Sequence, residues 1–194
     1  FFSEISKFML IYGDEMSGKK YILNSFINCY HRDKKIFYAS LEDDHFSEKI
    51  LEGISYFDVI VIDRLDLAPT NPHWEMGIFN LYNDLSKESK NQIIFLSDKS
   101  LNSIDFNLKD LQSRISSISA ISFVDLNDEE KRILMELIFR KRGISIDNSV
   151  LSYALERSSR SLENIINLVQ KIDEYSLSKK RNITVPLLKE ILES

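Results

Sequence analysis

Eight residues near the start of the chain, residues 13–20, have the spacing of a phosphate-binding loop. The run Gly-Asp-Glu-Met-Ser-Gly-Lys-Lys matches the first seven positions of the pattern G-x-x-x-x-G-K-S/T. In such a loop the glycines let consecutive backbone N–H groups face a phosphate, and the lysine, here Lys19, adds positive charge. With 5 glycines and 16 lysines in the chain, chance would produce this pattern only about 0.01 times. The residues predicted to contact the phosphates are Gly13, Ser17, Gly18, Lys19 and Lys20.

The eighth position of the loop departs from the pattern. A serine or threonine there would place a hydroxyl on Mg²⁺, whereas Lys20 is a cation without an acceptor and would repel the metal. Lys20 could instead supply part of the metal's charge to the phosphates. Because Asp14 and Glu15 add negative charge beside the anion site, the loop favours weak binding or a diphosphate ligand.

A second nucleotide motif is indicated by the apolar run Val-Ile-Val-Ile that ends at Asp63. A carboxylate after a buried strand can orient Mg²⁺ or its water, so Asp63 is the predicted metal-side acid; the alternative is an aspartate that merely ends a strand. In many ATPases the next residue is acidic and activates the attacking water, but here it is Arg64, and Asp66 follows two residues later. Lys20 and Arg64 together predict an ATPase fold with little or no hydrolysis of its own.

Three further polar residues could reach the same site. Asp98 follows an apolar run, and ligands gather at the carboxyl ends of parallel strands; the alternative is a role in a turn or helix cap. Arg114 could reach the γ-phosphate of a neighbouring subunit, or be a solvated surface arginine. Arg160, close to Arg157, precedes a helix and could fold over the nucleotide, or belong to a solvated helix end.

The elements that must position these residues alternate between strands and helices as far as Val124. Strands are predicted at 7–12, 35–39, 57–62, 92–96 and 119–124, with helices at about 19–30, 74–86 and 108–116. This alternation predicts an α/β fold with an open parallel sheet of five strands. Only helices are predicted afterwards, at 128–142, 148–157, 161–177 and 184–193. We therefore expect an α/β core over residues 1–124 and a small all-helical lid of four helices over 125–194.

Composition narrows the classes of function. The net charge of −5 argues against broad binding to the DNA backbone. The single cysteine, Cys29, excludes an internal disulfide, fits a reducing compartment and is predicted to be a core residue. His31, His45 and His73 lack the spacing of metal ligands. No apolar run reaches the roughly 18 residues of a membrane span, and no signal peptide is evident, so a cytoplasmic protein is expected.

The order of these motifs resembles the AAA+ family, an α/β phosphate-loop core followed by a helical lid with its own arginine. Within that family the chain resembles the bacterial replication initiator DnaA and, most closely, the shorter Hda-like proteins. The stretches that carry the resemblance are 61–66 with 73–83, 108–115, and the segments 128–131 and 184–192 that bound the expected lid.

The resemblance implies a regulator of replication initiation. Hda-like proteins bind adenine nucleotide, ADP or ATP, and with the DNA-loaded sliding clamp promote ATP hydrolysis on DnaA. Arg114 matches the finger arginine that acts in trans, and Arg160 matches the lid sensor. Asp63 matches the metal-side acid, and Gly13, Gly18 and Lys19 match the phosphate loop.

Two departures from the family pattern leave alternatives open. Lys20 replaces the loop hydroxyl, and the chain starts at Phe1 without the clamp-binding peptide and adenine-enclosing segment of the family, so an N-terminal piece is expected to be missing. No helix-turn-helix domain follows Ser194, so direct sequence-specific DNA binding is not expected. Association with a second copy or with another subunit is expected, in a head-to-tail arrangement. The alternative functions are the nucleotide-binding domain of a DnaA-type initiator or loader, and a scaffold that has lost nucleotide binding.

Overall fold

The computed structural model describes residues 6–30, 32–87, 91–144, 146–157, 161–179 and 183–192. The chain divides into two compact units. One unit comprises Phe1–Glu15 and Lys19–Val124, and the other comprises Asp125–Ser194 together with Met16–Gly18. Each unit has its own hydrophobic core. None of the helices in the described ranges is both long and apolar enough to cross a membrane.

The first unit is built on a five-stranded parallel sheet with the order β2-β3-β4-β1-β5. All five residues of β3 are buried, as expected for a parallel strand that is covered on both faces. The predicted fold class, a five-stranded parallel α/β sheet followed by helices, is confirmed. The strands are β1 (Phe8–Tyr12), β2 (Ile36–Ser40), β3 (Val59–Asp63), β4 (Gln92–Ser97) and β5 (Ser119–Ser122).

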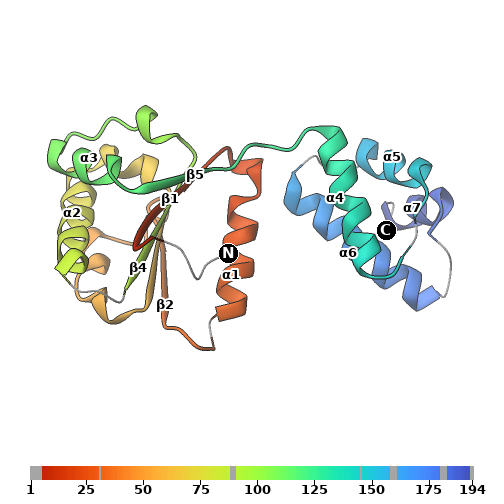
Figure 1. Cartoon of the computed structure of the whole chain (residues 1–194), viewed down its shortest axis with the longest axis horizontal. Helices are drawn as coiled ribbons and strands as arrows, with labels where there is room; N and C mark the ends of the chain where they lie inside the picture. Colours follow the sequence, from red (N-terminus) through yellow and green to blue (C-terminus); the bar gives the residue numbers. More distant parts are fainter. Residues whose placement is uncertain are drawn as a thin grey trace. The chain divides into compact units, whose positions relative to one another are not determined.

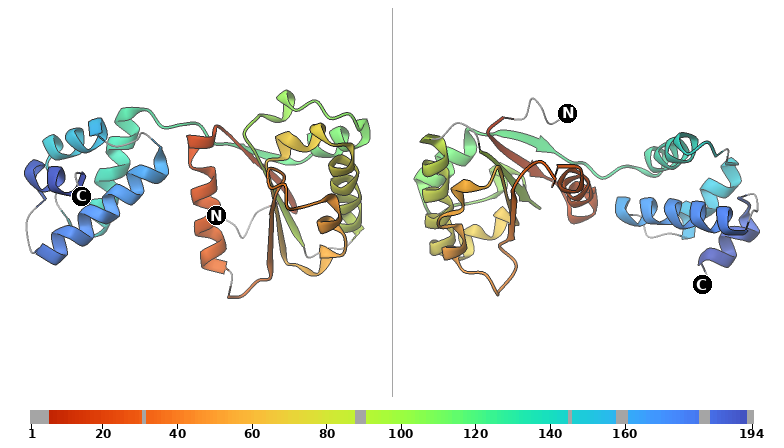
Figure 2. Two further views of the ribbon diagram at one scale, coloured as in Figure 1. Left: turned by 180° about the vertical axis from the view of Figure 1, so that it is seen from behind. Right: turned by 90° about the horizontal axis from the view of Figure 1, so that it is seen from below.

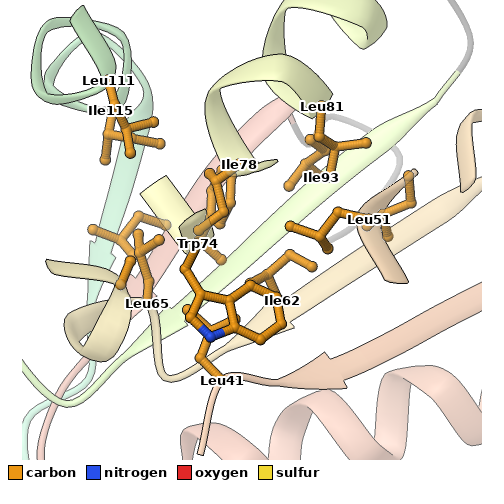
Figure 3. Close-up of a cluster of buried hydrophobic side chains, with 14 of the residues drawn as sticks. Leu41, Leu51, Ile62, Leu65, Trp74, Ile78, Leu81, Ile93, Leu111 and Ile115 are labelled. Carbon is orange, nitrogen blue, oxygen red and sulfur yellow. The ribbon is translucent and has the colours of Figure 1, made fainter. Parts of the chain in front are cut away.

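Helices cover both faces of this sheet. Helix α1 (Lys19–Tyr30) lies on one face, and α2 (Pro72–Lys87) and α3 (Lys109–Ser116) lie on the other, as Figures 1 and 2 show. Alternate residues of each strand point to opposite faces, so they enter different clusters. Val59 and Val61 pack with α1, whereas Ile62 packs under Trp74 and Ile78 of α2 (Figure 3).

Short 3₁₀ turns fill the connections between these elements. They are η1 (Glu15–Ser17), η2 (Glu48–Leu51), η3 (Ile54–Tyr56), η4 (Leu65–Thr70) and η5 (Leu101–Ser103). These turns could not be predicted from the sequence, because segments of three to six residues are too short to show a helical period. The turns add to the core, since Leu51, Ile54 and Leu65 are buried in it.

The second unit contains four helices within its described residues: α4 (Asp128–Lys141), α5 (Asn148–Arg157), α6 (Leu162–Lys179) and α7 (Val185–Leu192). Helix α4 begins with a capping box, in which Asn127 and Glu130 satisfy each other's backbone N–H groups. It ends before Gly143, whose φ of 73° gives the left-handed turn that glycine adopts readily. Phe139 and Val169 are among the fully buried residues of the core that joins the four helices.

Candidate nucleotide site

The predicted phosphate loop connects β1 to α1. The loop starts beside the end of β4, because the backbone N–H of Gly13 donates to the carbonyl of Ser97 at 3.2 Å. Gly18 has a φ of 84°, a left-handed conformation that glycine adopts without a side-chain clash. Helix α1 begins at the next residue, so its unpaired N–H groups lie at the loop.

The lysine of the loop is turned back onto the protein. Lys19 is fully buried, and its Nζ donates to the carbonyls of Gly13 at 2.8 Å and Asp14 at 3.0 Å. The same Nζ lies 2.6 Å from Oδ1 of Asp98, just after β4. The two carbonyls accept hydrogen bonds from this ammonium, and Asp98 forms an ion pair with it. A phosphate that binds Lys19 must therefore replace one of these partners.

Asp63, at the end of β3, is fully buried and has polar partners on both oxygens. Its Oδ2 accepts a hydrogen bond from the Tyr38 hydroxyl at 2.8 Å and lies 3.2 Å from Nζ of Lys20. Its Oδ1 accepts from the backbone N–H of Arg64 at 2.8 Å. Burial raises the pKa of Tyr38, and its hydrogen bond to Asp63 and the charges of Asp63 and Glu42 raise it further. Tyr38 therefore serves as a neutral donor to the buried carboxylate.

This arrangement does not fit the Mg²⁺ that loops of this type normally hold. The hydroxyl that would bind the metal is replaced by Lys20, whose ammonium lies against the carboxylate predicted to be the metal-side acid. Within the described ranges, moreover, no three His, Cys, Asp or Glu side chains form a group that could hold a metal ion. The ammonium of Lys20 takes the position at Asp63 that a metal ion would otherwise occupy.

Arg64 links the other carboxylates of the site. Its φ of 61° is the only positive value among the described non-glycine residues, and such a conformation costs free energy. Its guanidinium lies 3.0 Å from Glu42, 3.3 Å from Asp66 and 3.4 Å from Asp98. Burial alone would lower the pKa of Arg64, but the three carboxylates raise it. The residue that replaces the usual water-activating acid is therefore the centre of an ion-pair network.

Four of the predicted site residues lie close together in the structure. They are Lys19, Lys20, Asp63 and Asp98, and all four belong to the first unit. It also adds residues that the sequence analysis did not assign. Tyr38 and Glu42 lie 25 and 22 positions before their partners in the chain, so no local pattern could reveal them. Asp66 accepts the backbone N–H of Asp98 at 3.1 Å and so connects the ends of β3 and β4.

Arg114 lies in α3 on the other side of the sheet from α1 (Figure 1). Its side chain is exposed, and its guanidinium carbon is 6.0 Å from the centre of the Tyr82 ring. None of the ion pairs found among the described residues involves it. The start of α3 is held by Glu75 of α2, whose two carboxylate oxygens each accept a backbone N–H, from Asn107 and Leu108, at 2.8 Å.

The remaining candidates are placed as follows. Arg160, His31 and the side chain of Cys29 lie outside the described residues. Arg157 is in the last turn of α5, with its guanidinium carbon 5.7 Å from the Tyr153 ring centre. His45 is exposed and pairs with Asp43, and His73 is exposed in the first turn of α2.

Several solved structures of known proteins share this fold. Domain III of the replication initiation protein DnaA from Thermotoga maritima has a TM-score of 0.68 and 16% identity, over 98% of this chain and 84% of that one. DnaA from Aquifex aeolicus, solved with AMPPCP, has a TM-score of 0.67 and 19% identity, over 92% of this chain and 61% of that one. The Holliday junction branch migration motor RuvB of Thermotoga maritima has a TM-score of 0.67 and 14% identity, over 98% of this chain and 62% of that one.

Two matches were also found by sequence. The family model for the Hda lid domain matches residues 128–192. An uncharacterized protein of Haemophilus influenzae is 28% identical over 187 residues, which are 95% of this chain and 81% of that protein. Residues 128–192 therefore resemble the lid domain of Hda, and the chain shares its fold with DnaA domain III and RuvB.

Proposed function

We propose that this chain is an Hda-like regulator of chromosomal replication initiation, which promotes hydrolysis of the ATP bound to DnaA. Arg114 would act in trans, by reaching the γ-phosphate held by the partner. The likeness to DnaA and the match to the Hda lid support a function in replication. The observation that carries the specific proposal is the state of Arg114, an exposed arginine without an ion pair among the described residues.

Two features of Arg114 suit a finger arginine, namely that it has no ion pair to break among the described residues and that the start of its helix is held in place. A guanidinium stabilises the charge that develops on a transferring phosphoryl group, and such fingers contribute on the order of 10³- to 10⁵-fold in rate. An arginine that pairs with its own protein would have to give up that pair, whereas no ion pair of Arg114 is found among the described residues, and its guanidinium carbon lies 6.0 Å from the Tyr82 ring centre. Because Glu75 holds the backbone at the start of α3, docking costs mainly the rotamer entropy of the arginine side chain itself.

The chain's own site is proposed to bind adenine nucleotide but to hydrolyse it poorly. Lys20 lies where a metal-binding hydroxyl is needed, and Arg64 stands in place of an acid that could activate water. The loop keeps features that suit a phosphate, including the glycine turn at Gly18 and the amino end of α1. Output would therefore be directed at a second ATPase.

The proposed assembly is heterologous, because a finger on one surface must meet a nucleotide site on a different surface of the partner. Such contacts join molecules head to tail, and DnaA is the proposed partner, with the DNA-loaded sliding clamp as the platform. Self-association through the same surfaces would compete with this assembly.

The test is ATP hydrolysis on DnaA in the presence of clamp-loaded DNA and the complete chain. We expect Arg114→Ala to reduce the stimulated rate on the order of 10³-fold, while its affinity for nucleotide stays unchanged. Arg140→Ala is the matched control, since Arg140 is also exposed and helical but pairs with Glu136 in the lid. Equal stimulation by the Arg114→Ala protein and the unaltered chain would rule out the finger.

A scaffold that does not bind nucleotide is the second candidate, and one observation favours it. Lys19 is buried and already has three polar partners, of which Asp98 carries a full negative charge. If that pair does not open, the loop has no free charge to offer a phosphate. Calorimetric titrations with ADP and ATP that show no heat of binding would support the scaffold function.

A further inference from the structure

We propose that Lys20 takes the place of the divalent metal in this site, so that the chain binds a nucleoside diphosphate without Mg²⁺. The proposal rests on the nucleotide-binding part of the function given above, and it is independent of Arg114. It defines the ligand class of the site and the condition under which that ligand binds.

The first support is the position of the Lys20 ammonium. It lies 3.2 Å from Oδ2 of Asp63, and the second hydrogen-bonding group at that oxygen is the Tyr38 hydroxyl. A magnesium ion sits about 2.1 Å from its oxygen ligands and demands a nearly octahedral set. A metal on this oxygen would have to displace the Lys20 ammonium and would then lie close to that displaced cation. The ammonium supplies one positive charge there without these costs.

The second support is that Lys19 and Lys20 can turn towards a phosphate while Asp98 and Asp63 each keep another polar partner. If Lys20 leaves Asp63, the carboxylate keeps the Tyr38 hydroxyl and the N–H of Arg64. If Lys19 leaves Asp98, that carboxylate keeps the Arg64 guanidinium, 3.4 Å from its Oδ2. Since an unpaired buried charge is what makes such exchanges costly, the Arg64 network makes ligand entry feasible.

Charge selects a diphosphate over a triphosphate. In a metal-dependent site Mg²⁺ bridges the β- and γ-oxygens and neutralises part of their charge. Here two lysines must suffice, and the exposed Asp14 and Glu15 of the loop oppose any further negative charge. ADP is therefore expected to bind more tightly than ATP in the absence of metal.

The experiment is calorimetric titration of the complete chain with ADP, once in EDTA and once in millimolar Mg²⁺. The two dissociation constants are expected to agree within about twofold. A loss of tenfold or more in EDTA would overturn the proposal, as would ADP binding under neither condition. Weaker binding in EDTA would refute this inference and leave nucleotide binding itself intact, whereas ADP binding under neither condition would also refute the nucleotide-binding part of the proposed function. Neither outcome alters the Arg114 comparison on DnaA.

Substitution of Lys20 tests directly whether this lysine takes the place of the metal. Lys20→Thr restores the hydroxyl and frees Asp63, so its affinity for ADP should drop about tenfold in EDTA and recover when Mg²⁺ is added. Lys87→Thr removes one positive charge from an exposed position at the end of α2 and should leave affinity unchanged in both buffers. A Lys20→Thr protein that binds ADP as the unaltered chain does, with no response to Mg²⁺, would contradict the substitution of metal by lysine.

Discussion

Glu75 is predicted to hold α3, and with it Arg114, through two hydrogen bonds from a buried carboxylate. Its side chain is 2% exposed, and its two oxygens each accept a backbone N–H at 2.8 Å, from Asn107 and Leu108. Leu108 occupies the N-cap of α3 and has no side-chain oxygen to cap the helix. The carboxylate from α2 therefore takes over the capping function across 32 and 33 positions of sequence.

The change Glu75→Gln keeps the volume but replaces one acceptor by an amide NH₂. One N–H keeps a partner, whereas the other faces a donor, and an unsatisfied buried donor costs about 1–3 kcal/mol. We therefore expect the free energy of unfolding to fall by about 2 kcal/mol. The change should also lower stimulation of DnaA, because α3 starts less rigidly, without changing nucleotide affinity.

Urea unfolding measures the stability, and hydrogen exchange measures the Asn107 and Leu108 amides directly. Glu52→Gln is the control, an exposed glutamate of the same unit, and it should change stability by less than about 0.5 kcal/mol. If Glu75→Gln leaves both stability and the exchange of these two amides as they are, the capping argument is refuted.

Two further predictions concern the carboxylate network. At Arg64, with its φ of 61°, the Gly variant should be more stable than the Ala variant by about 1 kcal/mol, since both lose the guanidinium and only alanine keeps the backbone strain; equal urea midpoints would count against this. The pKa of Tyr38 is raised in the folded state, so folding favours the protonated hydroxyl. The stability that this hydroxyl contributes is complete below the ordinary pKa of about 10, and it is lost as the pH rises through the raised pKa. The difference in tyrosinate absorbance between the unaltered chain and Tyr38→Phe should thus appear above the ordinary range, and a difference at or below it would contradict the assignment.

The strands, the loop and the main helices could be predicted because each has a local signal. The apolar run before Asp63 spans a strand, and the glycine and lysine spacing marks the loop. Helix α2 begins two residues before the predicted start, at Pro72, because proline suits the first position of a helix and the preceding Asn71 side chain accepts the N–H of His73. Such differences concern the ends of elements and leave the fold unchanged.

The partners of the site residues could not be predicted, because they depend on which strand ends lie side by side. Asp98 was predicted as a site residue from its place after a strand, but its ion pairs with Lys19 and Arg64 depend on β4 lying between β1 and β3. The contact of Tyr38 with Asp63 likewise requires β2 beside β3. The strand order 2-3-4-1-5 therefore supplies what the sequence pattern lacks.

We propose that this chain acts on the nucleotide of another ATPase and hydrolyses its own poorly. The most direct measurement is Mg²⁺-dependent ATP turnover by the isolated chain, beside DnaA alone and the mixture on clamp-loaded DNA. We expect no turnover above background by the isolated chain, and hydrolysis in the mixture well above that of DnaA alone. Substantial turnover by the isolated chain, with no gain in the mixture, would contradict it.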